Sequence, residues 1–148
     1  MRRAELLLFM RGYRYAVEAS VSASGASQAA VVGIAVTDDL EIIFDTIEST
    51  RKAQNIRQNP RVAFVIGGWV GGDERTVQYE GVADEPYGAE LARVKEVYFR
   101  QFPDGPDRLS WPGLVYVRVR PSWIRYSNFN TNPPEIMVFE SLGRGLAE

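Results

Sequence analysis

The sequence predicts a single domain of mainly β class, a mostly antiparallel β-barrel with flanking helices. Its 148 residues suffice for one domain with a substantial core and are too few for two ordinary domains. Seven segments have the patterns of strands, and most neighbours are joined by short turns, which favours antiparallel pairing. Only three segments have helical patterns, and many strands with few helices suggest a barrel with helices at its ends or flanks. The expected domain covers 1–148, with an N-terminal helix within 1–14 and a less determined tail over 130–148.

The first predicted element is a short helix at residues 3–12. Leu7, Leu8 and Met10 are available to dock it against the domain, and Gly12 ends it. The charge pair and apolar run of this segment also resemble a signal peptide, but the run is short and arginines interrupt it, so we expect a cytoplasmic protein. No segment is long enough to span a bilayer, and no membrane association is expected.

Three strands follow the helix. Residues 15–23 alternate apolar and polar side chains, as in a strand whose two faces differ. Residues 29–36 are nearly all apolar, which predicts a strand buried on both faces. Asp38 and Asp39 form a turn, and the chain returns as a strand over 40–46.

Two further helices separate the remaining strands. One is predicted over 50–58, where Ser49 or Thr50 can cap it, and the other over 86–102, where apolar residues recur at i, i+4, i+7 and i+11. The remaining strands are predicted at 61–68, 75–85, 114–120 and 123–129. Pro121-Ser122 is expected to separate the last two, and "EIMVFE" in the tail is a candidate for one more short element.

Two residue types are missing from the chain, cysteine and histidine. Without cysteine there are no disulfides, thiolate metal sites or cysteine nucleophiles. Without histidine the chain lacks the commonest metal ligand, the usual axial haem ligand and the usual general base, so Ser-His-Asp hydrolysis is excluded. The net charge of −2 gives no indication of nucleic-acid binding. An enzyme of this composition is expected to use a cofactor for its chemistry.

The stretch "STRKAQNIRQNPRVAF", residues 49–64, has the most distinctive chemistry. Its hydroxyls, Ser49 and Thr50, precede two cations, Arg51 and Lys52, at a predicted helix N-terminus. Cations there oppose the helix dipole, which is a small local penalty. A bound phosphate would explain them, because it accepts hydrogen bonds from amides, a hydroxyl, a guanidinium and an ammonium together. A capped surface helix with solvated cations explains the same spacing.

The setting of this stretch resembles the FMN-binding split barrel of the pyridoxamine 5'-phosphate oxidase superfamily. The order is a buried strand, an acidic turn, a strand ending in "FDT", the 49–64 stretch, a glycine-rich loop and a strand ending in "EG". The resemblance covers roughly 15–129 and is strongest over 40–68. It implies an FMN-binding split β-barrel and a homodimer with two flavins at its interface. It also implies electron transfer to or from an unidentified small-molecule substrate.

The resemblance also implies cofactor contacts. The family holds the flavin phosphate with a Ser-Arg-Lys run, onto which Thr50, Arg51 and Lys52 fall. Thr46 falls on a flavin-contacting threonine, and Asp45 replaces an aromatic residue beside it. Thr76 falls where a glutamine often reaches the cofactor, and Tyr126 or Ser127 falls near a flavin-contacting tryptophan. The backbone of 30–35 lines the isoalloxazine. The implied cofactor-binding residues are Thr46, Thr50, Arg51, Lys52, Thr76, Val31, Val32 and Tyr126.

Departures from the family pattern bear on the activity. True pyridoxamine phosphate oxidases have an arginine and a lysine at the two ends of the stretch that is Ala30 to Ala35 here, and an Arg-x-His near the C-terminus. The histidine is missing here, so vitamin B6 oxidase activity is not expected. The alternatives are a reductase that binds the deazaflavin F420, with Arg57 and Arg61 as candidates for its acidic tail, and a non-catalytic flavin-binding protein. Haem is disfavoured because no histidine is present.

Some residues have competing interpretations. Trp69, in "GGWVGG", is a candidate to cover a flavin or a subunit interface, and an ordinary surface aromatic is an equal alternative. Arg118, Arg120 and Arg125 are expected to be exposed sheet arginines, with a role in binding an anion as the alternative. A barrel that binds nucleic acid or protein is disfavoured by the net acidity.

Overall fold

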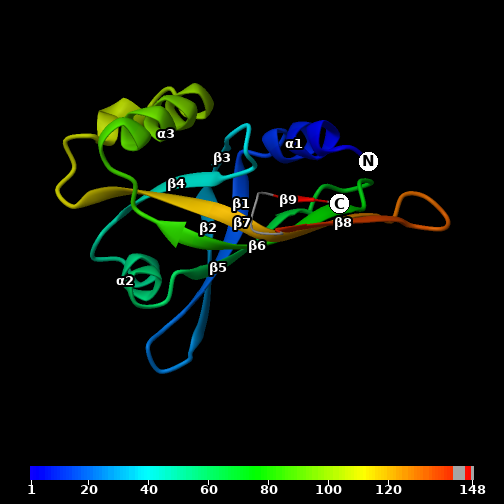
Figure 1. Ribbon diagram of the computed structural model, residues 1–148, viewed down its shortest axis with the longest axis horizontal. Helices are drawn as coiled ribbons and strands as arrows, with labels where there is room; N and C mark the ends of the chain where they lie inside the picture. Colours follow the sequence, from blue (N-terminus) through cyan, green and yellow to red (C-terminus); the bar gives the residue numbers. More distant parts are fainter. Residues whose placement is uncertain (142–145, 148) are drawn as a thin grey trace.

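A computed structural model describes residues 1–141 and 146–147. Figure 1 shows a sheet curled into a half-barrel, with helices against its flanks. The helices are α1 (Arg3–Arg11), α2 (Arg51–Gln58) and α3 (Gly88–Gln101), with a 3-10 turn at Gly105–Arg108. The strands are β1 (Tyr15–Val21), β2 (Ser27–Gly33), β3 (Ala35–Val36), β4 (Ile42–Ile47), β5 (Arg61–Gly67), β6 (Arg75–Asp84), β7 (Leu114–Asn128), β8 (Glu135–Ser141) and β9 (Leu146–Ala147).

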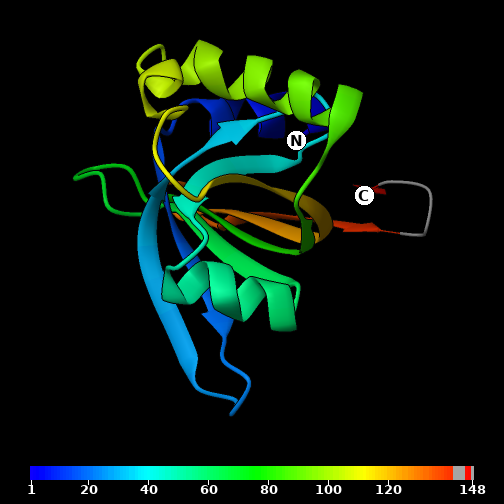
Figure 2. The ribbon, with the colours of Figure 1, turned by 90° about the vertical axis from the view of Figure 1, so that its left-hand side faces the viewer.

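The strands form one sheet in the order β2-β1-β5-β6-β7-β4-β3, with β8 on β7 and β9 on β8. Every one of these pairings is antiparallel. Figure 2 shows α3 and α2 on opposite sides of β4. The predicted split β-barrel with flanking helices is therefore confirmed, and "EIMVFE" does form a strand, β8.

The split in the barrel lies between β2 and the β3–β4 pair. β2 and β3 follow each other in the chain with only Ile34 between them, yet they occupy opposite edges of the sheet. The single strand predicted over 29–36 is therefore wrong, and so is its burial on both faces, since Val31 is 70% exposed. A change of direction at Ile34 turns the chain from one edge to the other.

The faces of β1 alternate as predicted, but the polar face is the buried one. Glu18 and Ser20 are buried, whereas Val17 and Ala19 are only half-buried. Val17 pairs with Val31 on one side and with Val65 on the other. An apolar sheet face therefore lies on the outside of the barrel, made of Val17, Ala19, Ala29, Val31, Ala63 and Val65.

The last long strand, β7, is continuous from Leu114 to Asn128, so the predicted separation at Pro121-Ser122 is wrong. A bulge opposite Glu80 and Gly81 accommodates the proline, which lacks the N–H that a regular ladder needs. Gly81 is required there because a Cβ at this position would collide with the carbonyl oxygen of Arg120.

The N-terminal helix closes one end of the barrel. Its buried residues are Leu6, Phe9 and Met10, so the docking predicted for Leu8 is wrong: this side chain is 75% exposed. Arg11 ties the helix to the turn before β4, with its Nη2 at 2.9 Å from Asp38.

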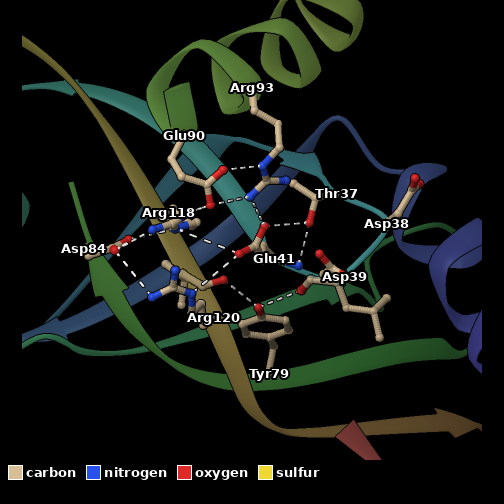
Figure 3. Close-up of polar contacts among 12 residues, drawn as sticks. Thr37, Asp38, Asp39, Glu41, Tyr79, Asp84, Glu90, Arg93, Arg118 and Arg120 are labelled. Atoms are coloured by element: carbon tan, nitrogen blue, oxygen red, sulfur yellow. Dashed lines mark hydrogen bonds and ion pairs between the residues drawn. The ribbon is translucent and has the colours of Figure 1, made fainter. Parts of the chain in front are cut away.

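A buried ionic network fixes α3 on the sheet (Figure 3). Arg118 donates to Asp84 at 3.0 and 2.7 Å and to Glu90 at 3.0 Å, and its side chain is only 4% exposed. The buried Glu41 accepts from Arg93 at 2.9 Å. Arg118 is therefore not the exposed sheet arginine that the sequence predicts, whereas Arg120 at the edge of the network is exposed. Three cations face three carboxylates, so the network has no charge left over for a ligand.

Replacing Arg118 with methionine is expected to destabilise the protein by about 3 kcal/mol, because Glu41 stays buried with fewer counter-charges. This loss of stability lies at the lower end of the range for breaking a buried ion pair, because Asp84 and Glu90 are half-exposed. Urea unfolding measures it. Arg100→Met removes an exposed pair with Glu96 on the same helix and should cost less than about 0.5 kcal/mol. Equal losses in the two variants would contradict a structural role for the network.

Candidate functional site

The N-terminus of α2 is built around two threonines. Thr50 caps the helix: its Oγ1 accepts from the Ala53 amide at 3.3 Å and donates to the Ile47 carbonyl at 2.9 Å. The Thr46 hydroxyl lies 3.0 Å from this Oγ1 and is left to donate to it. The structure therefore brings Thr46, at the end of β4, and Thr50 together, as the sequence predicts for one site.

Arg51 and Lys52, which follow Thr50, have N–H donors and charged side chains without partners in the described part of the chain. Among the described residues, the main-chain N–H groups of Arg51 and Lys52 have no hydrogen-bond acceptor. Neither side chain has a carboxylate within 4.0 Å in that part of the chain. Arg57, on the same helix, is instead held by Glu85 at 2.8 Å and by Glu48 at 3.6 Å. Free donors and positive charge are therefore concentrated at the N-terminal turn of α2, which suits an anion.

A polar cluster lies between α2 and the inner face of the hairpin β1–β2. Asn55, which is buried, donates from Nδ2 to Ser20 Oγ at 3.2 Å and to Gln28 Oε1 at 2.9 Å. Glu18 lies two residues before Ser20 on the same strand face, and its Oε1 has no partner among the described residues. We call the residues of this group the polar cluster: Glu18, Ser20, Gln28, Lys52 and Asn55.

Sequence reasoning missed four members of this cluster, all but Lys52. The available signal was the alternation in 15–23, which shows two faces and does not say which is buried. Burial raises the pKa of the Glu18 carboxyl, and the Ser20 hydroxyl and the Lys52 ammonium offset this rise in part.

The two valines predicted to line the flavin ring lie on opposite faces of β2. Val31 belongs to the exposed apolar sheet face, whereas Val32 is buried in the barrel core. Trp69 lies beside Val31, because the two side chains line one small hollow of about 280 Å³ together with Tyr15 and Val17. The Trp69 ring meets Tyr13 edge to face at 5.8 Å and is half exposed.

Thr76 and Tyr126 lie far along the sheet from the α2 site. Thr46 pairs with Val115 near the start of β7, whereas Thr76 pairs with Ser127 near its end. Tyr126 points into the barrel, where it packs against Phe9 at 5.4 Å. Within one chain, the structure therefore separates these two residues from Thr46, Thr50, Arg51 and Lys52. It also places Ser127, and not Tyr126, directly opposite Thr76.

Asp45 lies on the other side of β4 from Thr46. Its carboxylate accepts from the Tyr98 hydroxyl at 3.1 Å and from Arg108 Nε at 2.9 Å, so it anchors α3 and the turn after it. Among the described residues, no group of three or more acidic side chains could hold a metal ion. No helix in that part of the chain is long and apolar enough to cross a membrane.

The antiparallel half-barrel, open between β2 and β4 with a helix N-terminus at the opening, defines the protein as a split β-barrel. A comparison with protein families agrees with this class. The model of the family described as pyridoxamine 5'-phosphate oxidase matches residues 3–128, and the chain belongs to this family. No curated protein matches the sequence.

Solved structures with the same fold carry different names. The conserved hypothetical protein Rv2991 of Mycobacterium tuberculosis is 27% identical with a TM-score of 0.72, and the match covers 86% of this chain and 85% of that one. A pyridoxamine 5'-phosphate oxidase-related, FMN-binding protein of Nostoc punctiforme is 14% identical with a TM-score of 0.73, over 97% and 91% of the two chains. A heme-binding protein of Mycobacterium smegmatis is 15% identical with a TM-score of 0.78; the match covers 93% of this chain but only 58% of that protein.

The raised pKa of Glu18 predicts a pH-dependent stability. The folded protein keeps this proton to higher pH than the unfolded chain, whose glutamates titrate near about 4.3. The resulting stabilisation is complete below that pH and is lost as pH rises through the folded pKa. Glu18→Gln should therefore melt at a progressively higher temperature relative to the unchanged protein as pH rises from about 4 to 8. Calorimetry checks this, with the exposed Glu74→Gln as a control; parallel melting curves for Glu18→Gln and the unchanged protein would contradict it.

Proposed function

We propose that the protein is a homodimeric flavoprotein that binds FMN without a covalent bond and acts as an oxidoreductase on a small molecule. The observation that carries this proposal is the α2 N-terminus, where two free amides and two unpaired cations adjoin the Thr46–Thr50 hydroxyl pair. Membership of the family and the FMN-binding relative from Nostoc point in the same direction.

The residues at this turn fit a phosphate monoester. Arg51 offers a planar fork of donors and Lys52 a compact ammonium, and both supply a main-chain N–H to the same position. The Thr50 and Thr46 hydroxyls already donate within the turn, to the Ile47 carbonyl and to Thr50 Oγ1, so their role in the proposed site is to hold this helix end in place. FMN supplies the redox chemistry when it is bound, and the chain's own residues bind and orient it.

A second copy of the chain would complete the site. The apolar sheet face is exposed, with Val65, Tyr15 and Trp69 exposed as well as Val31, and a contiguous apolar surface of this kind favours a protein interface. Thr76 and Ser127 lie too far along the sheet to reach the α2 turn of their own chain. In a dimer formed through this face, the partner's Thr76 would approach the ring of a flavin held at α2.

The deazaflavin F420 is the second candidate, and the ion pairs make it less favourable. Its longer acidic tail needs more cations, and Arg57 is already held by Glu85 and Glu48. Arg61 is left, exposed at the start of β5. A non-catalytic flavin-binding protein would use the same turn. Haem is disfavoured despite the heme-binding relative, because no histidine is present to ligate it.

Replacing both Arg51 and Lys52 with alanine should weaken FMN binding by at least about 100-fold, because two charge-assisted contacts are lost. The absorption spectrum of the purified protein and the mass of the released ligand measure retention, and distinguish FMN from F420. Arg100→Ala, on the exposed side of α3, is the control and should keep the flavin. A folded double variant that retains FMN normally would rule out the phosphate assignment.

A charge in the apolar sheet face should disrupt the dimer. Val31→Glu places a carboxylate at the most exposed valine of this face, and desolvating it there would cost several kcal/mol, so a monomer is expected. Analytical ultracentrifugation gives the mass, and FMN content should fall in parallel. Leu8→Glu changes an equally exposed apolar residue on α1 and should leave the mass unchanged. An unchanged dimer in Val31→Glu would exclude this face as the interface.

A further inference from the structure

Glu18 is the most anomalous side chain in the described part of the molecule. The residue is 1% exposed, and the Oε1 atom of its carboxyl has no hydrogen-bond partner there. Its strand neighbours are Ala30 on β2 and Phe64 on β5, which offer no charge and no side-chain donor. Glutamate is almost never fully buried unless it is paired, so its position calls for a physical reason.

Among the described residues, Lys52 is the cation whose charge acts on Glu18. The hydrogen bond from Asn55 to Ser20 fixes α2 against β1. Lys52 lies three residues before Asn55, on the same helix face, and Glu18 lies two residues before Ser20, on the same strand face. These two spacings put Lys52 on the side of α2 that faces β1, where its charge acts on Glu18 at a longer range than an ion pair would. Gln28 and Ser20 are the other polar groups of β2 and β1 at this point, and both are neutral.

We propose that Glu18 is a selectivity residue for the phosphate site, and that it takes up one proton when a phosphate group engages Lys52. The proposal rests on the proposed function, because it requires a phosphate at the α2 turn. The affinity of the site for phosphorylated ligands is then highest when Glu18 is neutral. The affinity for a ligand without phosphate does not depend on the protonation of Glu18.

The physical reason is competition for one ammonium. Among the described residues, the Lys52 ammonium is the charged group that favours an ionised Glu18. A phosphate dianion at Lys52 neutralises that charge and adds its own repulsion, so the buried carboxylate then protonates. The coupling is reciprocal, because protonating Glu18 must favour phosphate binding by the same factor that phosphate binding favours protonation.

Calorimetric titration of FMN into the flavin-free, full-length protein tests the proposal at pH 7.5, where the phosphate of FMN is already largely dianionic. Repeating the titration in two buffers of different ionisation enthalpy counts the protons. The unchanged protein should take up protons on binding FMN, and its affinity for FMN should fall as pH rises. Glu18→Gln should take up none and bind FMN with little pH dependence. Riboflavin, which lacks the phosphate, should give no proton uptake with either protein.

A measurement on the unchanged sequence covers the case in which Glu18→Gln does not fold. The carboxyl carbon resonance of Glu18, followed by NMR at pH 7.5, should move to its protonated position when FMN is added and stay in place when riboflavin is added. A merely structural Glu18 would not respond in this way.

The outcomes separate the inference from the function. FMN binding with equal proton counts in the unchanged protein and Glu18→Gln, or an unmoved Glu18 resonance, overturns the inference and leaves the flavin assignment standing. Failure of the unchanged protein to bind FMN at any pH overturns both.

Discussion

The hydrogen bonds from Asn55 to Ser20 and Gln28 fix the part of the molecule that carries the candidate site. They join α2, which lies between β4 and β5 in the chain, to the inner side of the hairpin β1–β2. The position of α2 against this hairpin decides where its N-terminal amides point and how near Lys52 lies to Glu18. A buried amide that satisfies two partners at once allows few alternative positions for the helix.

The opening itself follows from the change of direction at Ile34. Because β2 and β3 leave this residue toward opposite sheet edges, the barrel cannot close by pairing β2 with β4. The polar cluster lies between α2 and the hairpin β1–β2, whereas α1 buries Leu6, Phe9 and Met10 and α3 buries Val94 and Tyr98. Charge at the α3 side is balanced within the chain by the Arg118 network, and charge at the α2 side is not. This contrast is the reason for proposing an anion site at α2 and not at α3.

Much of the fold was predictable, because periodicity and turn residues act locally. The three helices, the antiparallel order and the capping of α2 by Thr50 all followed from short patterns. Two failures concern strand bounds, the break at Ile34 and the continuity of β7, and the others concern which face is buried. Ser20 faces inward because Asn55, which is distant in sequence, binds it there, and Glu18 lies on the same strand face. Arg118 is buried because Asp84 and Glu90, also distant in sequence, bind its guanidinium. Within the candidate site, the N-terminal turn of α2 could be predicted from the run of residues 49–52. The polar cluster could not be predicted, because no local sequence pattern indicates a hydrogen bond between residues distant in the chain.

The bulge in β7 has a consequence for comparing this chain with its relatives. Side chains in a strand alternate between two faces, so one extra residue works as a parity switch: Val117 and Val119 face the core before the bulge, and Ile124 and Tyr126 face it afterwards. The ambiguity between Tyr126 and Ser127 arises here, because a comparison that gains or loses one position across Pro121 exchanges inside for outside along the whole remainder of the strand. A relative with the same sequence pattern but no bulge would turn the core-facing side chains of this segment to the outer face, and the outer ones to the core.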